Sequence, residues 1–121
     1  MILADTSIWI DYLAREDHAL RTLLQQDKIL VHPLLIGELA MGNLRNRANI
    51  LGFLHELPFA AFVLNAEVLE LLETHLLFGR GIGYIDAHLL ASVRATAGAS
   101  LWTRDRRLHD IATELGVAYT G

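Results

Sequence analysis

Four acidic residues lie at positions from which a folded chain could bring their carboxylates together: Asp5, Glu38, Asp86 and Asp105. Asp5 directly follows an apolar run, and Asp105 lies three residues past a second short strand-like segment, 100–102. If these segments are neighbouring strands of a parallel sheet, both carboxylates project into one crevice at the carboxyl ends of the strands. Each of the two aspartates also precedes a predicted helix, so helix capping explains either residue equally well when it is taken singly.

Glu38 and Asp86 are expected on helix faces that are otherwise apolar. The side chains that share those faces are Leu34, Leu35, Met41 and Gly42 around Glu38, and Leu89, Leu90 and Val93 near Asp86. A carboxylate on a buried face costs several kcal/mol unless it is paired with a cation or bound to a metal. The alternative to a metal at either residue is a structural salt bridge with an arginine.

The ligand types available in the chain indicate which metal such a site would take. The sequence has no cysteine, and its six histidines show no pairing at zinc-ligand spacing. Carboxylates alone suit hard cations that prefer oxygen, so we expect Mg²⁺, with Mn²⁺ as a substitute. The matching reaction is phosphodiester cleavage, in which one metal lowers the pKa of an attacking water and metal ions balance the charge on the phosphate.

The basic residues are the candidates for contact with the phosphates of a nucleic acid. The net charge of −4 argues against a general nucleic-acid-binding surface, but two Mg²⁺ at the acids would balance that charge. Nine of the ten basic residues are arginines, which bind phosphate in a bidentate manner. Arg80, in the glycine-rich segment 79–83, and Arg104, beside Asp105, are the arginines predicted to contact the substrate; the alternative for any surface arginine is simple solvation.

The apolar runs and helix signals predict strands alternating with helices. The predicted strands are 1–4, 29–31, 62–64, 100–102 and 117–119. The predicted helices are 7–13, 18–26, 33–43, 47–57, 65–78, 84–97 and 106–115, with Pro33 in a first turn and Asn65 as an N-cap. This spacing predicts an α/β fold, a three-layer α/β/α sandwich with a central parallel sheet.

The length of 121 residues fits a single domain, 1–121. The N-terminal segment has acids and no basic lead-in, which is not typical of a signal peptide. No uncharged apolar run approaches the ~20 residues that a membrane span requires. We therefore expect a cytoplasmic protein that does not associate with a membrane.

The chain is unusually apolar for its length, with 53% hydrophobic residues and a mean hydropathy of +0.34. Part of this apolar surface is therefore expected to face another chain. The predicted helix 65–78 carries an apolar arc wider than the ~100° that one core contact requires. The arc consists of Val68, Leu69, Leu71, Leu72, Leu76 and Phe78. We predict a homodimer through this helix, with Leu71 toward the edge of the arc.

Four segments resemble the successive sequence blocks of PIN-domain ribonucleases, and more narrowly of VapC-type toxins. They are LADTSIWIDYLA (3–14), LLIGELAMG (34–42), GYIDAHLLASV (83–93) and LWTRDRRL (101–108). Together they span nearly the whole chain, in the order of the family. The resemblance implies a central parallel sheet and a Mg²⁺-dependent endoribonuclease activity. It also implies a cognate antitoxin, encoded beside the toxin, that inhibits the activity.

The resemblance assigns roles to individual acids. It places the metal-binding acids at Asp5 and Asp86, with Glu38 and Asp105 as supporting acids. Many PIN domains carry a further acid two residues after the last aspartate, where this chain has Arg107. This departure leaves open how directly Asp105 takes part in metal binding.

Hydroxyl groups complete the set of residues expected to contact the RNA substrate. The resemblance implies such a role for Thr6 or Ser7, next to the first acid, and for Thr103. These residues join Arg80 and Arg104 as the predicted substrate-binding residues.

Other enzymes also place acids at the strand ends of a parallel sheet. A receiver-type phosphoacceptor domain would have paired acids near the first strand and a lysine after the last, whereas Thr6 follows Asp5 and Lys28 is the only lysine. A phosphatase with an aspartyl nucleophile would have a second aspartate at the position of Ser7. The remaining alternatives are a PIN-type nuclease of RNA processing and a non-catalytic α/β interaction module.

Overall fold

The computed structural model describes residues 1–15 and 18–121 of the chain. Its strands are β1 (Ile2–Ala4), β2 (Ile29–Leu30) and β3 (Ser100–Trp102). Its helices are α1 (Thr6–Arg15), α2 (His18–Gln25), α3 (Pro33–Ala40), α4 (Arg47–Glu56), α5 (Asn65–Thr74), α6 (Tyr84–Ala95) and α7 (Arg106–Glu114). Helices connect the strands, with four of them between β2 and β3, and the predicted α/β class is confirmed.

The three strands form a parallel sheet in the order β2-β1-β3. Isolated parallel pairings extend the sheet at both edges, between Val31 and Phe59 and between Leu101 and Ala118. The predicted strand 117–119 is therefore reduced to a single pairing beside β3. The predicted strand 62–64 is wrong, because those residues have no strand structure and the chain pairs with the sheet three residues earlier.

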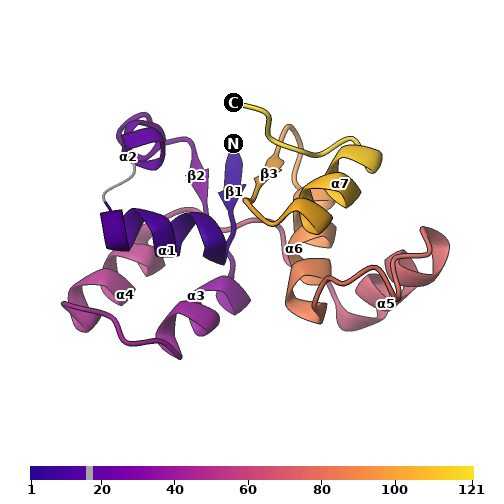
Figure 1. The fold of residues 1–121 in the computed structure, drawn as a ribbon, viewed down its shortest axis with the longest axis horizontal. Coiled ribbons are helices and arrows are strands. Elements are labelled where there is room, and N and C mark those ends of the chain that lie inside the picture. The colour runs from indigo at the N-terminus through magenta and orange to yellow at the C-terminus, as the bar shows by residue number, and fades with distance from the viewer. Residues whose placement is uncertain (16–17) are drawn as a thin grey trace.

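Helices enclose the sheet on both sides. Figure 1 shows the strands between one group of helices, α1 to α4, and a second group, α5 to α7. All residues of β1 and β2 are buried, as expected for strands covered on both faces. Their side chains join those of the surrounding helices in one apolar cluster. The layers thus hold the central strand, β1, away from water along its whole length.

The start of α3 is fixed by a cap and a proline. The Nδ1 atom of His32 accepts a hydrogen bond from the backbone N–H of Leu34 at 3.0 Å. Pro33 is the first helical residue, as the sequence predicts, because its missing N–H would have no partner in a first turn. The ring of His32 is buried beneath this turn.

The start of α5 differs from the prediction. Leu64, rather than Asn65, is the N-cap, and its backbone N–H donates to Oε1 of Glu67 at 3.3 Å. The side-chain oxygen of Asn65 instead accepts a hydrogen bond from the hydroxyl of Tyr84, at 3.2 Å, on a different helix. A contact between segments far apart in the chain has thus replaced the local cap.

The predicted apolar arc on helix 65–78 is only partly exposed. Leu71 is 8% exposed and belongs to the core, so its predicted position at the edge of the arc is wrong. Leu69, at 53% exposed, and Leu76, at 64%, face solvent instead. The helix ends at Thr74, and Leu76 has a φ of +54°, which turns the chain away from the helix axis. Within the described residues, no helix is long and apolar enough to cross a membrane.

The buried ring of His32 makes a prediction about stability. His32 is only 7% exposed. This burial, together with the positive charge of His88, lowers the pKa of His32 from 6.5 to about 4. Since the folded state binds the proton less tightly than the unfolded chain, the stabilisation is complete above pH 6.5 and decreases as pH falls toward 4.

Between pH 6.5 and pH 4, the free energy of unfolding should decrease in both the wild type and His32→Asn. The decrease should be larger in the wild type, by up to about 3 kcal/mol. Asparagine is a good N-cap and does not titrate, so the variant keeps the helix start without the ionisable ring. Urea unfolding at a series of pH values measures the difference. Parallel pH profiles for the two proteins would contradict the assigned pKa.

Candidate active site

Asp5 lies at the carboxyl end of the central strand, beside the end of β3. Its backbone N–H donates to the carbonyl of Trp102 at 3.0 Å, which places the two strand ends side by side. The predicted neighbour relation of these strands is therefore confirmed. Only 5% of Asp5 is exposed, so its carboxylate is almost completely removed from water.

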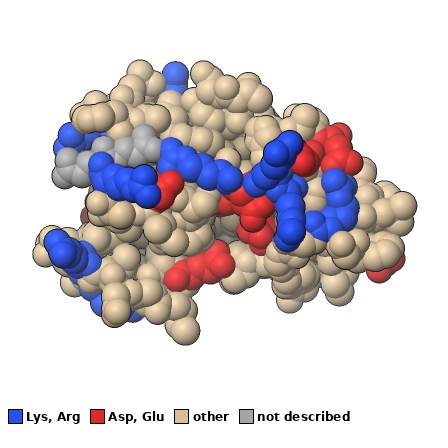
Figure 2. All heavy atoms as spheres, in the orientation of Figure 1, with Lys and Arg blue, Asp and Glu red and all other residues tan. Residues whose placement is uncertain are grey.

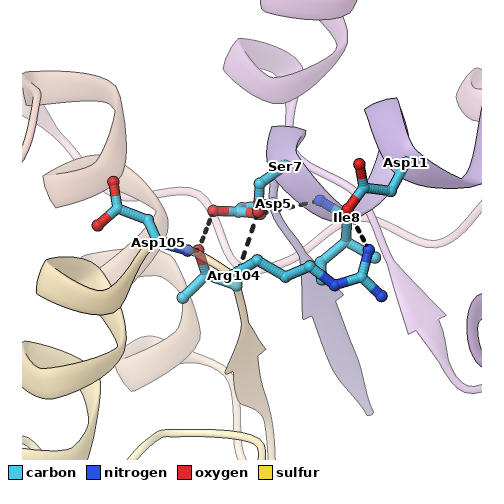
Figure 3. Close-up of polar contacts among 7 residues, drawn as sticks. Asp5, Ser7, Ile8, Asp11, Arg104 and Asp105 are labelled. Atoms are coloured by element: carbon cyan, nitrogen blue, oxygen red, sulfur yellow. Dashed lines mark hydrogen bonds and ion pairs between the residues drawn. The ribbon is translucent and has the colours of Figure 1, made fainter.

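Three donors hold the Asp5 carboxylate (Figure 3). The Ser7 hydroxyl donates to Oδ1 at 2.5 Å, and the backbone N–H of Ile8 donates to the same oxygen at 3.3 Å. The Thr103 hydroxyl donates to Oδ2. The contact with Ile8 caps the first turn of α1, so the capping role and the position in the crevice occur together. The donors fix the orientation of the carboxylate.

The hydroxyls of Ser7 and Thr103 connect the segments that follow β1 and β3. The Ser7 oxygen accepts the backbone N–H of Arg104 at 3.0 Å. The Thr103 oxygen accepts the backbone N–H of Asp105, also at 3.0 Å. Each hydroxyl therefore donates to Asp5 and accepts from the segment after β3, which holds the two strand ends in a fixed relation.

Glu38 and Asp86 approach this point from two helices. Glu38, on α3, accepts a hydrogen bond from the Thr6 hydroxyl at 2.7 Å. Asp86, in the first turn of α6, accepts the backbone N–H of Gly83 at 3.1 Å. Both carboxylates are half-buried. In residues 1–15 and 18–121 neither forms an ion pair, so the structure does not support the predicted alternative of a structural salt bridge.

The electrostatics of Asp86 show that the four acids share one environment. Burial raises the pKa of Asp86, and the hydrogen bond from Gly83 partly opposes this effect. The negative charges of Asp5, Glu38 and Asp105 raise it further. Four segments separated in sequence therefore bring their carboxylates close enough for mutual repulsion. We call these four residues the acidic cluster.

Asp105 serves as the N-cap of α7 and is the acid of the cluster most exposed to solvent. Its Oδ1 accepts the backbone N–H groups of Arg107, at 2.9 Å, and Leu108, at 3.2 Å. As the side chains stand, no three Asp, Glu or His residues of the described chain lie close enough together to hold a metal ion. The reason is visible in the contacts, because each carboxylate of the cluster faces a protein donor.

The two arginines expected to contact substrate are both engaged in ion pairs. The guanidinium of Arg80 donates to Glu114 on α7, at 2.5 and 3.2 Å. The guanidinium of Arg104 pairs with Asp11 on α1 (Figure 3). Figure 2 shows acidic side chains gathered in the middle of this face, with basic side chains on both sides. Substrate contact by Arg80 and Arg104 stays a prediction.

Some contacts near the cluster could not be found from sequence. Asp11 has no motif that indicates its pairing with Arg104. Arg107, which stands where many PIN domains have an acid, packs against Gly81, where φ is +85° and an added Cβ would lie 2.6 Å from the guanidinium. Arg107 thus contacts the loop that leads to Asp86, and this loop position requires glycine.

Known proteins similar to this chain identify its family. The family model described as the PIN domain matches residues 2–114. The chain is 47% identical over 118 residues to Ribonuclease VapC32 from two strains of Mycobacterium tuberculosis. The similar region covers 98% of this chain and 95% of the relative.

Because nearby negative charges act on Asp86, a variant that is neutral at this position should be more stable than the wild type. Since the fold raises the pKa of Asp86, its ionised form weakens the folded state at neutral pH. In metal-free buffer, Asp86→Asn should therefore increase the free energy of unfolding. Glu70→Gln, which removes one charge at an exposed position of α5, is the matched control and should change it little. Urea unfolding compares the variants, and a clear loss of stability in Asp86→Asn would contradict the predicted repulsion.

Proposed function

The chain belongs to the PIN-domain family, and we propose that it is a metal-dependent endoribonuclease of the VapC toxin type. The observation that carries the proposal is the acidic cluster: Asp5, Glu38 and Asp105 lie close enough to Asp86 for their charges to act on it, and none of the four has a basic partner in the described part of the chain. The similarity to Ribonuclease VapC32 over nearly the whole length supports a toxin rather than a nuclease of RNA processing.

The donor set of the cluster fits a divalent cation. Carboxylate oxygens are the ligands that Mg²⁺ and Mn²⁺ prefer. The positive charge of such an ion would offset both the burial of the Asp86 carboxylate and the nearby negative charges, which together raise its pKa. We propose that Asp5 and Asp86 hold Mg²⁺ directly and that Glu38 and Asp105 support it. Asp5 is fixed by its donors, so the other three carboxylates, which are more exposed, must turn from their present partners to share an ion with it.

A bound ion would lower the pKa of a water molecule and offset the charge that develops on the phosphate. The residues of the chain prepare the site for this chemistry. Ser7 and Thr103 donate their protons to Asp5, and Thr6 donates to Glu38. Because these protons are already committed to carboxylates, the three hydroxyls are proposed to orient the acids instead of contacting RNA. A preorganised site of this kind needs little rearrangement during the reaction.

The proposal predicts the behaviour of variants that remove one charge and keep the shape. Purified protein should cleave RNA with Mg²⁺ or Mn²⁺ and lose this activity in EDTA. Asp5→Asn should lower the rate by about 100-fold or more, the scale expected when a charged group is removed from an active site. Asp110→Asn, on an exposed turn of α7, is the matched control and should cleave at the wild-type rate.

In cells, induction of the wild-type chain should arrest growth and Asp5→Asn should not. Full RNA cleavage by Asp5→Asn in metal-free buffer would refute the metal-dependent mechanism. Equal growth arrest by both proteins would remove the support for the toxin role but leave the nuclease assignment standing.

An apolar groove next to the cluster is proposed to receive the antitoxin. The groove lies between α1, α3 and α4, has a volume of about 600 Å³, and includes Thr6 and Glu38 in its wall. Its apolar lining consists of Ile10, Leu13, Leu39, Leu44 and Ile50. A partner segment that fills the groove could place a basic side chain at Glu38 and supply the charge balance that a metal otherwise provides.

The exposed apolar side chains of Leu69, Leu76 and Phe78, on and after α5, support a homodimer. Leu69→Glu should shift the protein to a monomer, because it places a charge on this surface without disturbing the core. Met41→Glu, at an exposed apolar residue on the far end of α3, is the control and should leave the dimer intact. Light scattering at micromolar concentration measures the mass, and a wild-type monomer would contradict the proposal.

A further inference from the structure

A second hollow opens beside the acidic cluster and is lined by aromatic side chains. Its volume is about 490 Å³, within the range of small-molecule sites. Its lining includes the rings of Trp102, His109 and Tyr119, together with Thr103 and small residues of α2 and the C-terminal segment. Neither the metal chemistry of the cluster nor the groove proposed for the antitoxin uses this hollow.

The aromatic side chains form a platform with a cation above it. The ring centroids of Trp102 and Tyr119 lie 5.4 Å apart, with their planes tilted by 59°. The guanidinium carbon of Arg104 lies 6.0 Å from the centroid of the Trp102 ring. Both rings are only half-buried, so each keeps part of its surface toward the hollow.

The hollow borders the acidic cluster at one residue, Thr103. Thr103 lines the hollow and donates its hydroxyl proton to Asp5. The carbonyl of Trp102 accepts the backbone N–H of Asp5 at 3.0 Å. Thr103 and Trp102 thus lie between the Asp5 carboxylate and the hollow, where the nucleotide next to a phosphate at the cluster would come.

We infer that this hollow binds one unstacked base of the RNA substrate, adjacent to the phosphate that is cleaved. The inference rests on the proposed ribonuclease function and adds a base-binding subsite to it. Bases stack on aromatic side chains and on arginine planes, and a base can do so only after leaving its own stack. The His109 ring and the Tyr119 hydroxyl add polar groups that can meet a base edge.

Steady-state cleavage of a single-stranded RNA tests the subsite. Tyr119→Leu should raise KM by about 10-fold, within the range that follows loss of one stacked base, and should change kcat much less. Tyr119→Phe keeps the ring and should retain a KM near wild type. Phe53→Leu removes an exposed ring on α4, away from the hollow, and is the control for loss of any surface aromatic residue.

Two further measurements observe the wild-type protein directly, and only the second uses a variant, as a control. In the wild-type protein, replacing single nucleotides of the RNA by abasic ones should impair cleavage at one fixed position next to the cut. Free nucleosides, which carry no phosphate, should quench the fluorescence of wild type but not of Trp102→Phe, since Trp9 is buried.

The outcomes separate this inference from the proposed function. If wild type cleaves RNA but Tyr119→Leu behaves like Phe53→Leu, and no abasic position matters, the base subsite is refuted and the nuclease assignment stands. If wild type cleaves no RNA with Mg²⁺, the proposed function fails, and quenching by nucleosides alone still reports on the hollow. Absence of quenching by every nucleoside would also count against a base and favour a protein segment as the occupant.

Discussion

A nearly buried negative charge at the end of the central strand governs the arrangement around it. Asp5 has lost its contact with water and has no basic partner in the part of the chain that the structure describes. Such a charge is tolerated only when hydrogen-bond donors surround it. The donors come from Ser7 and Ile8 at the start of α1 and from Thr103 after β3. The same contacts cap a helix and join two strand ends, so the local fold and the candidate site depend on one carboxylate.

The other three acids of the cluster make the site around Asp5 suitable for a metal ion. Glu38, Asp86 and Asp105 each have a protein donor of their own. Burial nevertheless raises the pKa of Asp86, and the charges of Asp5, Glu38 and Asp105 raise it further. Donors that are neutral orient a carboxylate without cancelling its charge, so the repulsion persists. A divalent cation is the simplest group that relieves it. In our proposal, the neighbouring hollow at Trp102 binds one base and so orients the RNA strand at the cluster.

Features that depend on local interactions could be predicted from the sequence, and features that depend on contacts between distant residues could not. A strand buried on both faces, or an acid on an apolar helix face such as Asp86, leaves a local pattern that periodicity detects. The cap at Asn65 was predicted wrongly because a contact from another helix outweighed its local preference. The strand at 62–64 and the position of Leu71 depended on where the chain leaves the sheet and where α5 ends. The pairing of Arg80 with Glu114 joins residues far apart in sequence and has no local signal.

Anomalous scattering from crystals of the wild-type protein soaked in Mn²⁺ tests the central claim most directly, because it locates the ion without reference to activity. The account predicts a manganese peak in contact with the carboxylate oxygens of Asp5 and Asp86, and no peak there in crystals of Asp86→Asn. Manganese bound elsewhere on the protein, with the acidic cluster empty and its carboxylates still facing their protein donors, would contradict it.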